Sequence, residues 1–154
     1  MGLTLQKSTA KKIYPDSPDW FKKVLEENFG KELFKKRSIE DIKTFEDACD
    51  ELSIDPETVT QENDTPDEAA YKKFKIIAAA INQGWTPDWN NSNQYKWTPW
   101  FKLSSGFGFS GSGYGRSSAG AGAGSRLCTD SSEKARYIAE QFKAEYQDYF
   151  LYSE

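Results

Sequence analysis

The side chains able to do chemistry in this chain are few in kind, because its 154 residues include no histidine and only two cysteines. Without histidine there is no Ser-His-Asp or Cys-His nucleophile, no HExxH zinc site and no imidazole general base. Cys49 and Cys128 stand far apart in the sequence and form no CxxC pair, so they do not indicate a structural zinc site. Carboxylates are the remaining candidates for catalysis.

Four carboxylates gather in sequence around one expected helix and its exit: Asp64, Asp67, Glu68 and Asp88. Three of them are ordinary acids of a helix start, where they favour the positive end of the helix dipole. Asp88 lies between a proline and a tryptophan, which is a turn setting. The glycines have no phosphate-loop spacing. We therefore expect no enzyme, no catalytic residue, no bound metal and no cofactor.

Binding chemistry is concentrated between Trp85 and Thr129. This segment is rich in aromatic residues and glycine, and from Trp89 to Thr129 it contains no Asp or Glu. Trp and Tyr are favoured interface anchors, and lysine or arginine beside them attracts anionic groups. These residue types predict a binding surface with the following members: Trp100, Lys96, Lys102, Tyr114, Arg116 and Arg126.

Residues 94–103 alternate as a β-strand does. The alternation puts on one face Tyr95, Trp97, Phe101 and Leu103, and on the other Lys96, Thr98, Trp100 and Lys102. Trp100 is therefore expected on the solvent side, among lysines. The alternative is that most aromatic residues of the segment pack under the helices as core.

A short stretch, Gly106-Phe-Gly-Phe109, matches the middle of the RNP1 pattern of RNA-recognition motifs. The flanking positions depart from that pattern, since they carry Ser105, Ser110 and Ser112. The βαββαβ element order is also absent. What remains is a more general hypothesis, in which aromatic rings stack on unpaired bases beside lysines.

Helical patterns lie on both sides of the aromatic segment. Expected helices follow Ser17, Thr44 and either Thr65 or Asp64, and a long last helix follows Asp130 and ends near Phe150. Strands are expected at 94–103, around 107–109 and at 125–128, while 110–124 is either a long hairpin loop or a poorly specified strand.

This order of elements predicts an α+β fold. Helices are followed by a small antiparallel β-meander, and the long C-terminal helix packs on the sheet. We expect a single domain over residues 1–154, with an N-terminal helical layer over about 1–60 and a helix-meander-helix core over about 64–154.

Composition favours a water-soluble chain, with a net charge of −4 and 29% charged residues. Overall acidity argues against a nonspecific binder of duplex DNA. No apolar run has the length of a signal peptide or a membrane span, and the cysteines are expected as free thiols. We expect a cytoplasmic protein without a membrane partner. Pro99 blunts the edge of its strand, so a monomer or small homo-oligomer is expected.

Several segments carry a family resemblance: 44–49, 63–68, 82–101, 104–110, 124–128 and 139–142. Together they resemble a family of small uncharacterised proteins typical of bacteriophages and integrated mobile elements of gut bacteria. The resemblance implies a phage-type origin in a bacterial host and no particular activity. The chain departs from the family at 110–124, where Gly, Ser and Ala replace bulkier residues.

Three functions follow from these observations. The first is a non-enzymatic accessory protein that binds a protein partner, of host or phage, through the aromatic and basic surface. The second is a single-stranded nucleic-acid-binding module that uses the same residues, and strong loss of binding with salt would mark it. The third is a virion component or self-assembling subunit.

Overall fold

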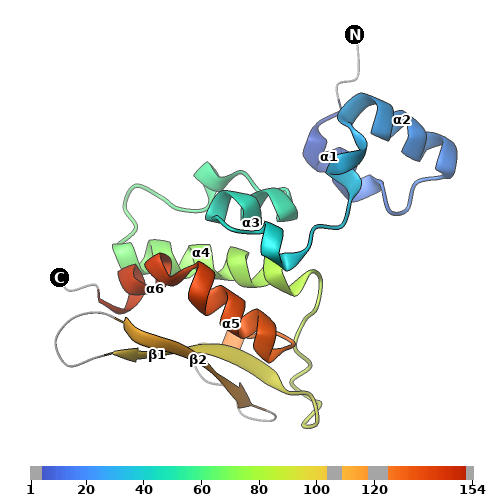
Figure 1. Ribbon diagram of the computed structural model, residues 1–154. Coiled ribbons are helices and arrows are strands. Elements are labelled where there is room, and N and C mark those ends of the chain that lie inside the picture. Colours follow the sequence, from blue (N-terminus) through green and yellow to red (C-terminus); the bar gives the residue numbers. More distant parts are fainter. Residues whose placement is uncertain (1–4, 104–108, 118–124, 152–154) are drawn as a thin grey trace. The chain divides into compact units, whose positions relative to one another are not determined.

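The computed structural model describes residues 5–103, 109–117 and 125–151, and at 102, 103, 109–117 and 125 it describes the backbone alone. The chain divides into two compact units, residues 1–38 and 39–154 (Figure 1). We call them unit 1 and unit 2.

Unit 1 consists of two helices and a 3-10 turn: α1 (Lys7–Ile13), α2 (Asp19–Phe29) and η1 (Lys31–Phe34). Helix α2 begins after Pro18, and its chain leaves through Gly30 at φ +84°, a left-handed conformation that glycine adopts without strain. Among the described residues of this unit, the buried side chains are Ala10 and Leu25. Tyr14 and Phe34 stack beside them with ring centroids 4.1 Å apart.

Unit 2 holds the remaining elements, in the order η2 (Ile39–Asp41), α3 (Phe45–Leu52), η3 (Pro56–Thr58), α4 (Pro66–Asn82), β1 (Lys96–Leu103), β2 (Phe109–Ser117), η4 (Ser125–Leu127), α5 (Ser132–Gln141) and α6 (Lys143–Phe150). The helix starts expected after Thr44 and Thr65 are confirmed, and both carry a capping box.

The elements of unit 2 stack in layers (Figure 1). Helix α3 packs on α4, α4 packs on α5 and α6, and α5 packs on both strands. One buried cluster joins these layers, in which the ring of Tyr146 lies 4.1 Å from Phe74 of α4 and 4.4 Å from Phe101 of β1. Phe101 therefore fixes one face of the strands to the helices.

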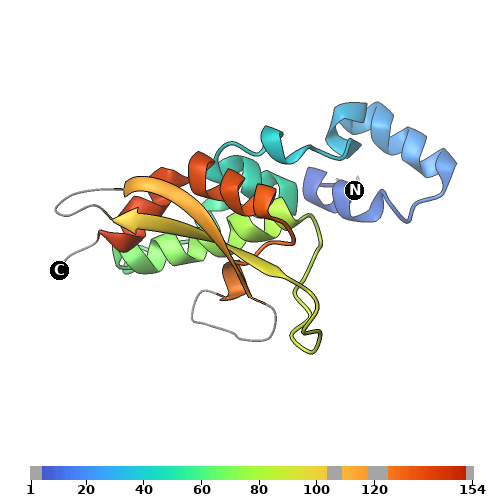
Figure 2. The same cartoon turned by 60° about the horizontal axis from the view of Figure 1, so that its bottom comes forward.

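Strands β1 and β2 form an antiparallel hairpin with Trp100 paired to Gly113, and the register shifts between Lys102 and Leu103. In Figure 2 the hairpin comes forward and the helices of unit 2 lie behind it. The other face of the hairpin is thus turned away from α5.

The predicted α+β class with a β-meander is wrong. The described residues are mostly helical, and among them β1 and β2 are the strands that pair. The expected third strand at 125–128 is instead the 3-10 turn η4, followed by a single bridge between Thr129 and Trp97. The carbonyl of Cys128 is taken by the side chain of Asn82, and α5 begins at Ser132, so one residue is left to pair with β1.

The expected long C-terminal helix is two helices. It breaks at Phe142, whose backbone leaves the helical region at φ −107° and ψ 32° while its side chain is fully buried. The boundary between compact units falls after Ser38, whereas the expected N-terminal layer extended to about residue 60. Helix α3 lies beyond Ser38, and its buried Phe45, Ala48 and Cys49 belong to the core cluster of unit 2.

Candidate functional site on the hairpin

Trp100 is the most exposed large apolar side chain of unit 2 among the described residues, at 66%. Its neighbour Phe101 is 9% exposed. Successive side chains of a strand point to opposite faces, so Phe101 meets the helices and Trp100 lies on the face turned away from them. This agrees with the expectation that Trp100 is exposed.

Glycine lies opposite each of the neighbouring positions on this face. The register pairs Thr98 with Gly115, Trp100 with Gly113 and Lys102 with Gly111. Paired residues of antiparallel strands share a face, and glycine in a strand often marks a place where a ligand or another backbone comes close. We call Thr98, Trp100, Gly113 and Gly115 the Trp100 face. It offers one large ring beside bare backbone.

Lys96 was expected on the same solvent-facing side, but the structure buries it to 1% exposure. Its Nζ donates to the carbonyl oxygens of Asn91 at 3.2 Å and Gln94 at 2.9 Å. It also lies 5.2 Å from the ring centroid of Trp89. The ammonium is therefore part of the internal structure of the loop before β1, and Lys96 is not a solvent-facing partner of Trp100.

Side chains hold that loop in a series of short turns. The backbone N–H of Asn90 donates to Oδ1 of Asp88, and that of Asn93 to Oδ1 of Asn91. The N–H of Asp88 in turn donates to Oε1 of Gln94. Asp88 thus has a turn-forming role, as its sequence setting indicated.

Two further rings are presented by this loop. Trp89 is 40% exposed and Tyr95 is 47% exposed. The strand alternation had placed Tyr95 on the inward face, and that expectation is wrong. Lys96, the next residue, is buried instead, because the loop folds over the start of β1 and provides carbonyl partners for its ammonium group.

The other predicted binding residues fall in different places. Arg126 is exposed on η4. The backbones of Tyr114 and Arg116 pair with Pro99 and Trp97, so neither is the register partner of Trp100. The side chains of Lys102, Tyr114 and Arg116 lie outside the described residues, as does the backbone of the RNP1-like stretch at 106–108.

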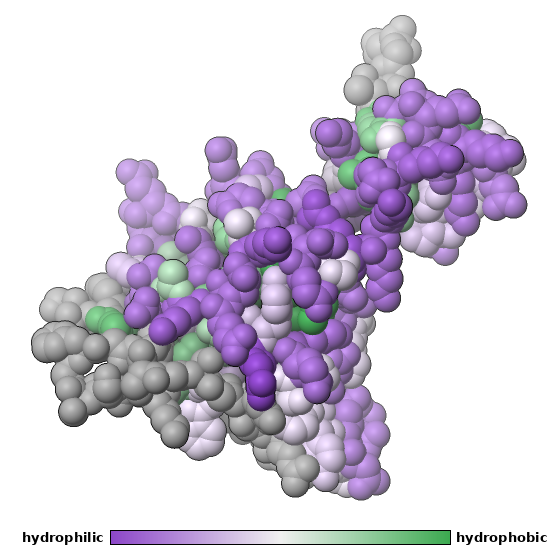
Figure 3. Space-filling model, in the orientation of Figure 1, coloured by the Kyte–Doolittle hydropathy of each residue, from purple (hydrophilic) through white to green (hydrophobic). Residues whose placement is uncertain are grey.

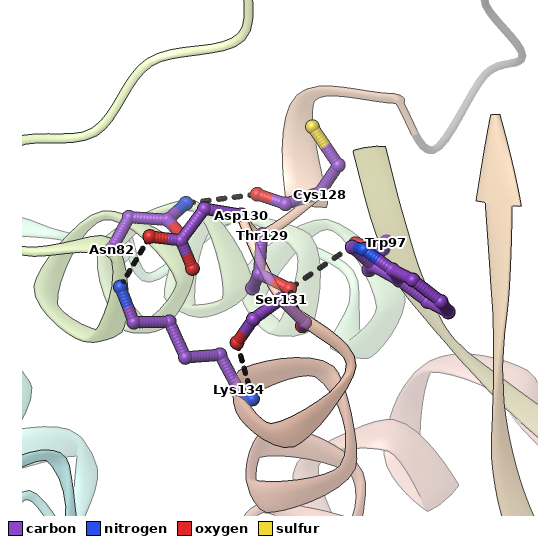
Figure 4. Close-up of polar contacts among 7 residues, drawn as sticks. All are labelled: Asn82, Trp97, Cys128, Thr129, Asp130, Ser131 and Lys134. Carbon is purple, nitrogen blue, oxygen red and sulfur yellow. Dashed lines mark hydrogen bonds and ion pairs between the residues drawn. The ribbon is translucent and has the colours of Figure 1, made fainter. Parts of the chain in front are cut away.

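A buried polar cluster holds β1 to α4 and α5, and the sequence analysis did not find it (Figure 4). Trp97 and Thr129 exchange two backbone hydrogen bonds, of 3.0 and 2.7 Å. Thr129 is fully buried, and its hydroxyl lies 2.9 Å from the carbonyl of Ser131. Asn82 donates to the carbonyl of Cys128 at 2.8 Å. In the sequence, Asn82 is a polar residue at the end of the regular apolar pattern of α4. That position was the one sequence signal that pointed to this cluster.

The carboxylates at the start of α4 serve the helix. Glu68 accepts from the N–H of Thr65 at 3.0 Å, and Asp67 accepts from the hydroxyl of Thr65. Asp64 pairs with Lys72, and the hydrogen bond from Lys72 lowers the pKa of Asp64. Over the described part of the chain, no group of three or more acidic or cysteine side chains is placed to hold a metal ion.

The two thiols are buried and free. Burial raises the pKa of both Cys49 and Cys128, so each is held in its neutral, less nucleophilic form. Within the described ranges, no helix combines the length and apolar character that crossing a membrane requires.

Comparison with protein families, with curated proteins and with solved structures gives no match to this chain. The family resemblance therefore stays a prediction from sequence. A function for the hairpin is therefore inferred from the geometry of unit 2.

Proposed function

We propose that this chain is a non-enzymatic binding protein that holds a protein partner on the Trp100 face of its hairpin. The observation that carries the proposal is the exposed indole of Trp100, 66% accessible, paired across the strands with Gly113. The resemblance noted in the sequence adds a phage-type accessory role, in the cytoplasm of a bacterial host, to the same proposal.

A ring in this setting suits protein recognition. Interface energy is concentrated in a few large rigid side chains, Trp first among them, each surrounded by surface that excludes water. Gly113 and Gly115 have no side chains to hold a partner away from the backbone. A partner that covers the indole of Trp100 would therefore meet no side chain at the two paired glycines.

The two alternative functions are less well supported on this surface. A phosphate backbone needs cations beside the ring, and of the cations predicted there Lys96 has its ammonium buried against loop carbonyls. Strand-to-strand assembly through β1 is disfavoured, because the outer edge of that strand carries Pro99 and the bridge from Trp97 to Thr129. Both features favour binding through the face of the hairpin.

Affinity capture from bacterial lysate with quantitative mass spectrometry tests the proposal. The baits are the wild-type chain, Trp100→Ala and Gly113→Val, with Trp20→Ala as the matched control. Trp20 is as exposed as Trp100, at 69%, but belongs to unit 1. Valine at 113 suits a strand and adds side-chain bulk opposite Trp100.

We expect a protein that wild type and Trp20→Ala retain equally and that Trp100→Ala and Gly113→Val lose. Loss of one hot-spot tryptophan corresponds to a decrease in affinity of about 30-fold or more. If Trp100→Ala retains the same proteins as wild type, or if wild type retains none, the proposal is wrong.

A further inference from the structure

Charge is divided unequally between the two units. Residues 1–38 contain nine lysines and arginines against five acidic residues, a net charge of +4. Residues 39–154 contain eleven lysines and arginines against nineteen acidic residues, a net charge of −8. An acidic protein thus includes a small basic unit, and the binding role proposed for the hairpin makes no use of it.

The fold of unit 1 leaves its cations accessible. Exposed lysines come from each of its elements and from the segment after η1: Lys7, Lys12, Lys23, Lys31, Lys35 and Lys36. Two of the five acidic groups are occupied within the unit. Glu26 accepts the hydroxyl proton of Tyr14, and Glu32 pairs with Lys35 at 2.8 Å. In Figure 3 the visible surface of unit 1 is mostly hydrophilic.

One aromatic ring stands out from this basic unit. Trp20 is 69% exposed in the first turn of α2, and Val24, one turn later, is 41% exposed. Leu25 faces the unit's interior, and the half-buried ring of Phe21 lies beside the indole, with ring centroids 5.3 Å apart. Side chains three and four positions apart are neighbours on a helix, so Lys23 and Val24 flank the indole of Trp20.

We propose that unit 1 binds a short stretch of single-stranded nucleic acid, with Trp20 stacked on a base and exposed lysines of the unit at phosphates. Binding of single strands without sequence preference combines these two features, a cationic surface and an exposed aromatic ring. Lysine suits the role because its ammonium is a mobile point charge that follows a flexible backbone.

Two other anionic partners fit the unit less well. Insertion of α2 into a duplex groove would bring toward phosphates Asp19, exposed in the first turn of that helix, and Asp16, exposed in the turn before it. The second such partner is an acidic protein. A stable protein interface buries about 800 Å² on each partner around an apolar centre. Unit 1 offers Trp20 and Val24 as its exposed large apolar side chains among the described residues.

Fluorescence anisotropy of the full chain with labelled oligothymidylate, at salt concentrations from low to physiological, tests the inference. Trp20→Ala removes the stacking ring, and Trp20→Phe keeps a smaller one. A double variant, Lys35→Gln with Lys36→Gln, removes two cations. Trp100→Ala is the matched control, because its exposed indole belongs to unit 2. Competitors are a duplex of equal length and polyglutamate.

We expect binding that weakens as salt rises, with a logarithmic slope of about −2 for three phosphate contacts. Trp20→Ala is expected to weaken binding about tenfold, with partial recovery in Trp20→Phe, because stacking on one base is lost and partly restored. The double lysine variant is expected to flatten the slope by about 1.4. Trp100→Ala is expected to bind as wild type does.

Any of four results would overturn the inference. These are no binding at low salt, equal competition by the duplex, equal competition by polyglutamate, and unchanged affinity in Trp20→Ala. If Trp100→Ala loses binding and Trp20→Ala does not, the nucleic-acid site lies on the hairpin instead. Circular dichroism of each variant confirms that the helices are intact. The outcome is independent of whether the hairpin captures a protein.

Discussion

Lys96 shows how a single residue can depart from a correct strand pattern. Its position in β1 agrees with the alternation, and a lysine in a half-buried strand is ordinarily a solvent-facing residue. The loop at 88–94 folds over it and supplies two carbonyl oxygens and the face of Trp89. A buried ammonium is tolerated when its donors have partners. Those partners come from loop geometry, which residue types alone do not predict.

Replacing this lysine tests its structural role. Lys96→Met keeps the length of the side chain and removes the ammonium, so the carbonyls of Asn91 and Gln94 lose their donor. We expect unit 2 to lose about 2 kcal/mol of unfolding free energy in denaturant titration. Amides of residues 88–94 should also exchange faster with deuterium.

The matched control for this variant is Lys143→Met, which removes a lysine exposed on α6. Its effect on the unfolding free energy should stay within about 0.5 kcal/mol. If the two variants are equally stable, the ammonium of Lys96 does not hold the loop.

Helices were the best predicted elements, because their signals are local. The capping boxes at Thr44 and Thr65 and the apolar face of α4 lie within the helices that they define. The third strand was not predictable in this way. It is replaced by η4 because Asn82, 46 positions earlier, binds the carbonyl of Cys128. The break at Phe142 likewise depends on burial of that ring between layers.

The same contrast holds for the candidate site. The exposure of Trp100 followed from strand parity, which is a local rule. To predict which glycines lie opposite Trp100, the register of β2 has to be known. The low side-chain bulk of that strand leaves its register unspecified in the sequence. The exposed rings of Trp89 and Tyr95 depend on the course of a loop, so sequence parity placed Tyr95 wrongly.

Phe101 is one of the side chains that attach the hairpin to the helices. Phe101 is 9% exposed, with ring centroids 4.4 Å from Tyr146 and 5.9 Å from Phe150. Truncation of a buried Phe to Ala costs about 3 to 5 kcal/mol. We expect Phe101→Ala to lower the unfolding free energy of unit 2 by that amount, measured by chemical denaturation.

Trp100→Ala provides an adjacent control in the same strand, on the other face. Its exposed indole contributes little to folding, so the expected change is within about 1 kcal/mol. A large loss in Trp100→Ala would show that this ring packs in the folded protein, and it would weaken the case for a free binding face.

At the scale of the whole molecule, charge follows the division into units. The segment 39–71 alone contains twelve acidic residues and one lysine, directly after the basic unit 1. The net charge of the whole chain, −4, hides this contrast because it pools the two units. The boundary after Ser38 separates the basic segment from the acidic one. It depends on the packing of α3 on α4, which assigns α3 to unit 2.

The two units also differ in the size of their cores. In the part of unit 1 that the structure describes, the buried apolar residues are Ala10 and Leu25, whereas the core cluster of unit 2 joins α3, α4, β1, α5 and α6. A domain with so small a core is marginal in stability. Leu25→Ala removes its largest buried aliphatic side chain, at a cost of about 2 to 5 kcal/mol. Unit 1 is then expected to unfold.

Hydrogen exchange with mass spectrometry measures this change unit by unit. In wild type, amides of α1 and α2 should exchange much faster than those of α4, because local opening of a small core costs little. In Leu25→Ala, protection of α1 and α2 should vanish while that of α4 remains as in wild type. Equal loss in both units would show that they unfold as one cooperative body, and the basic unit could then not be treated as a separate binding module.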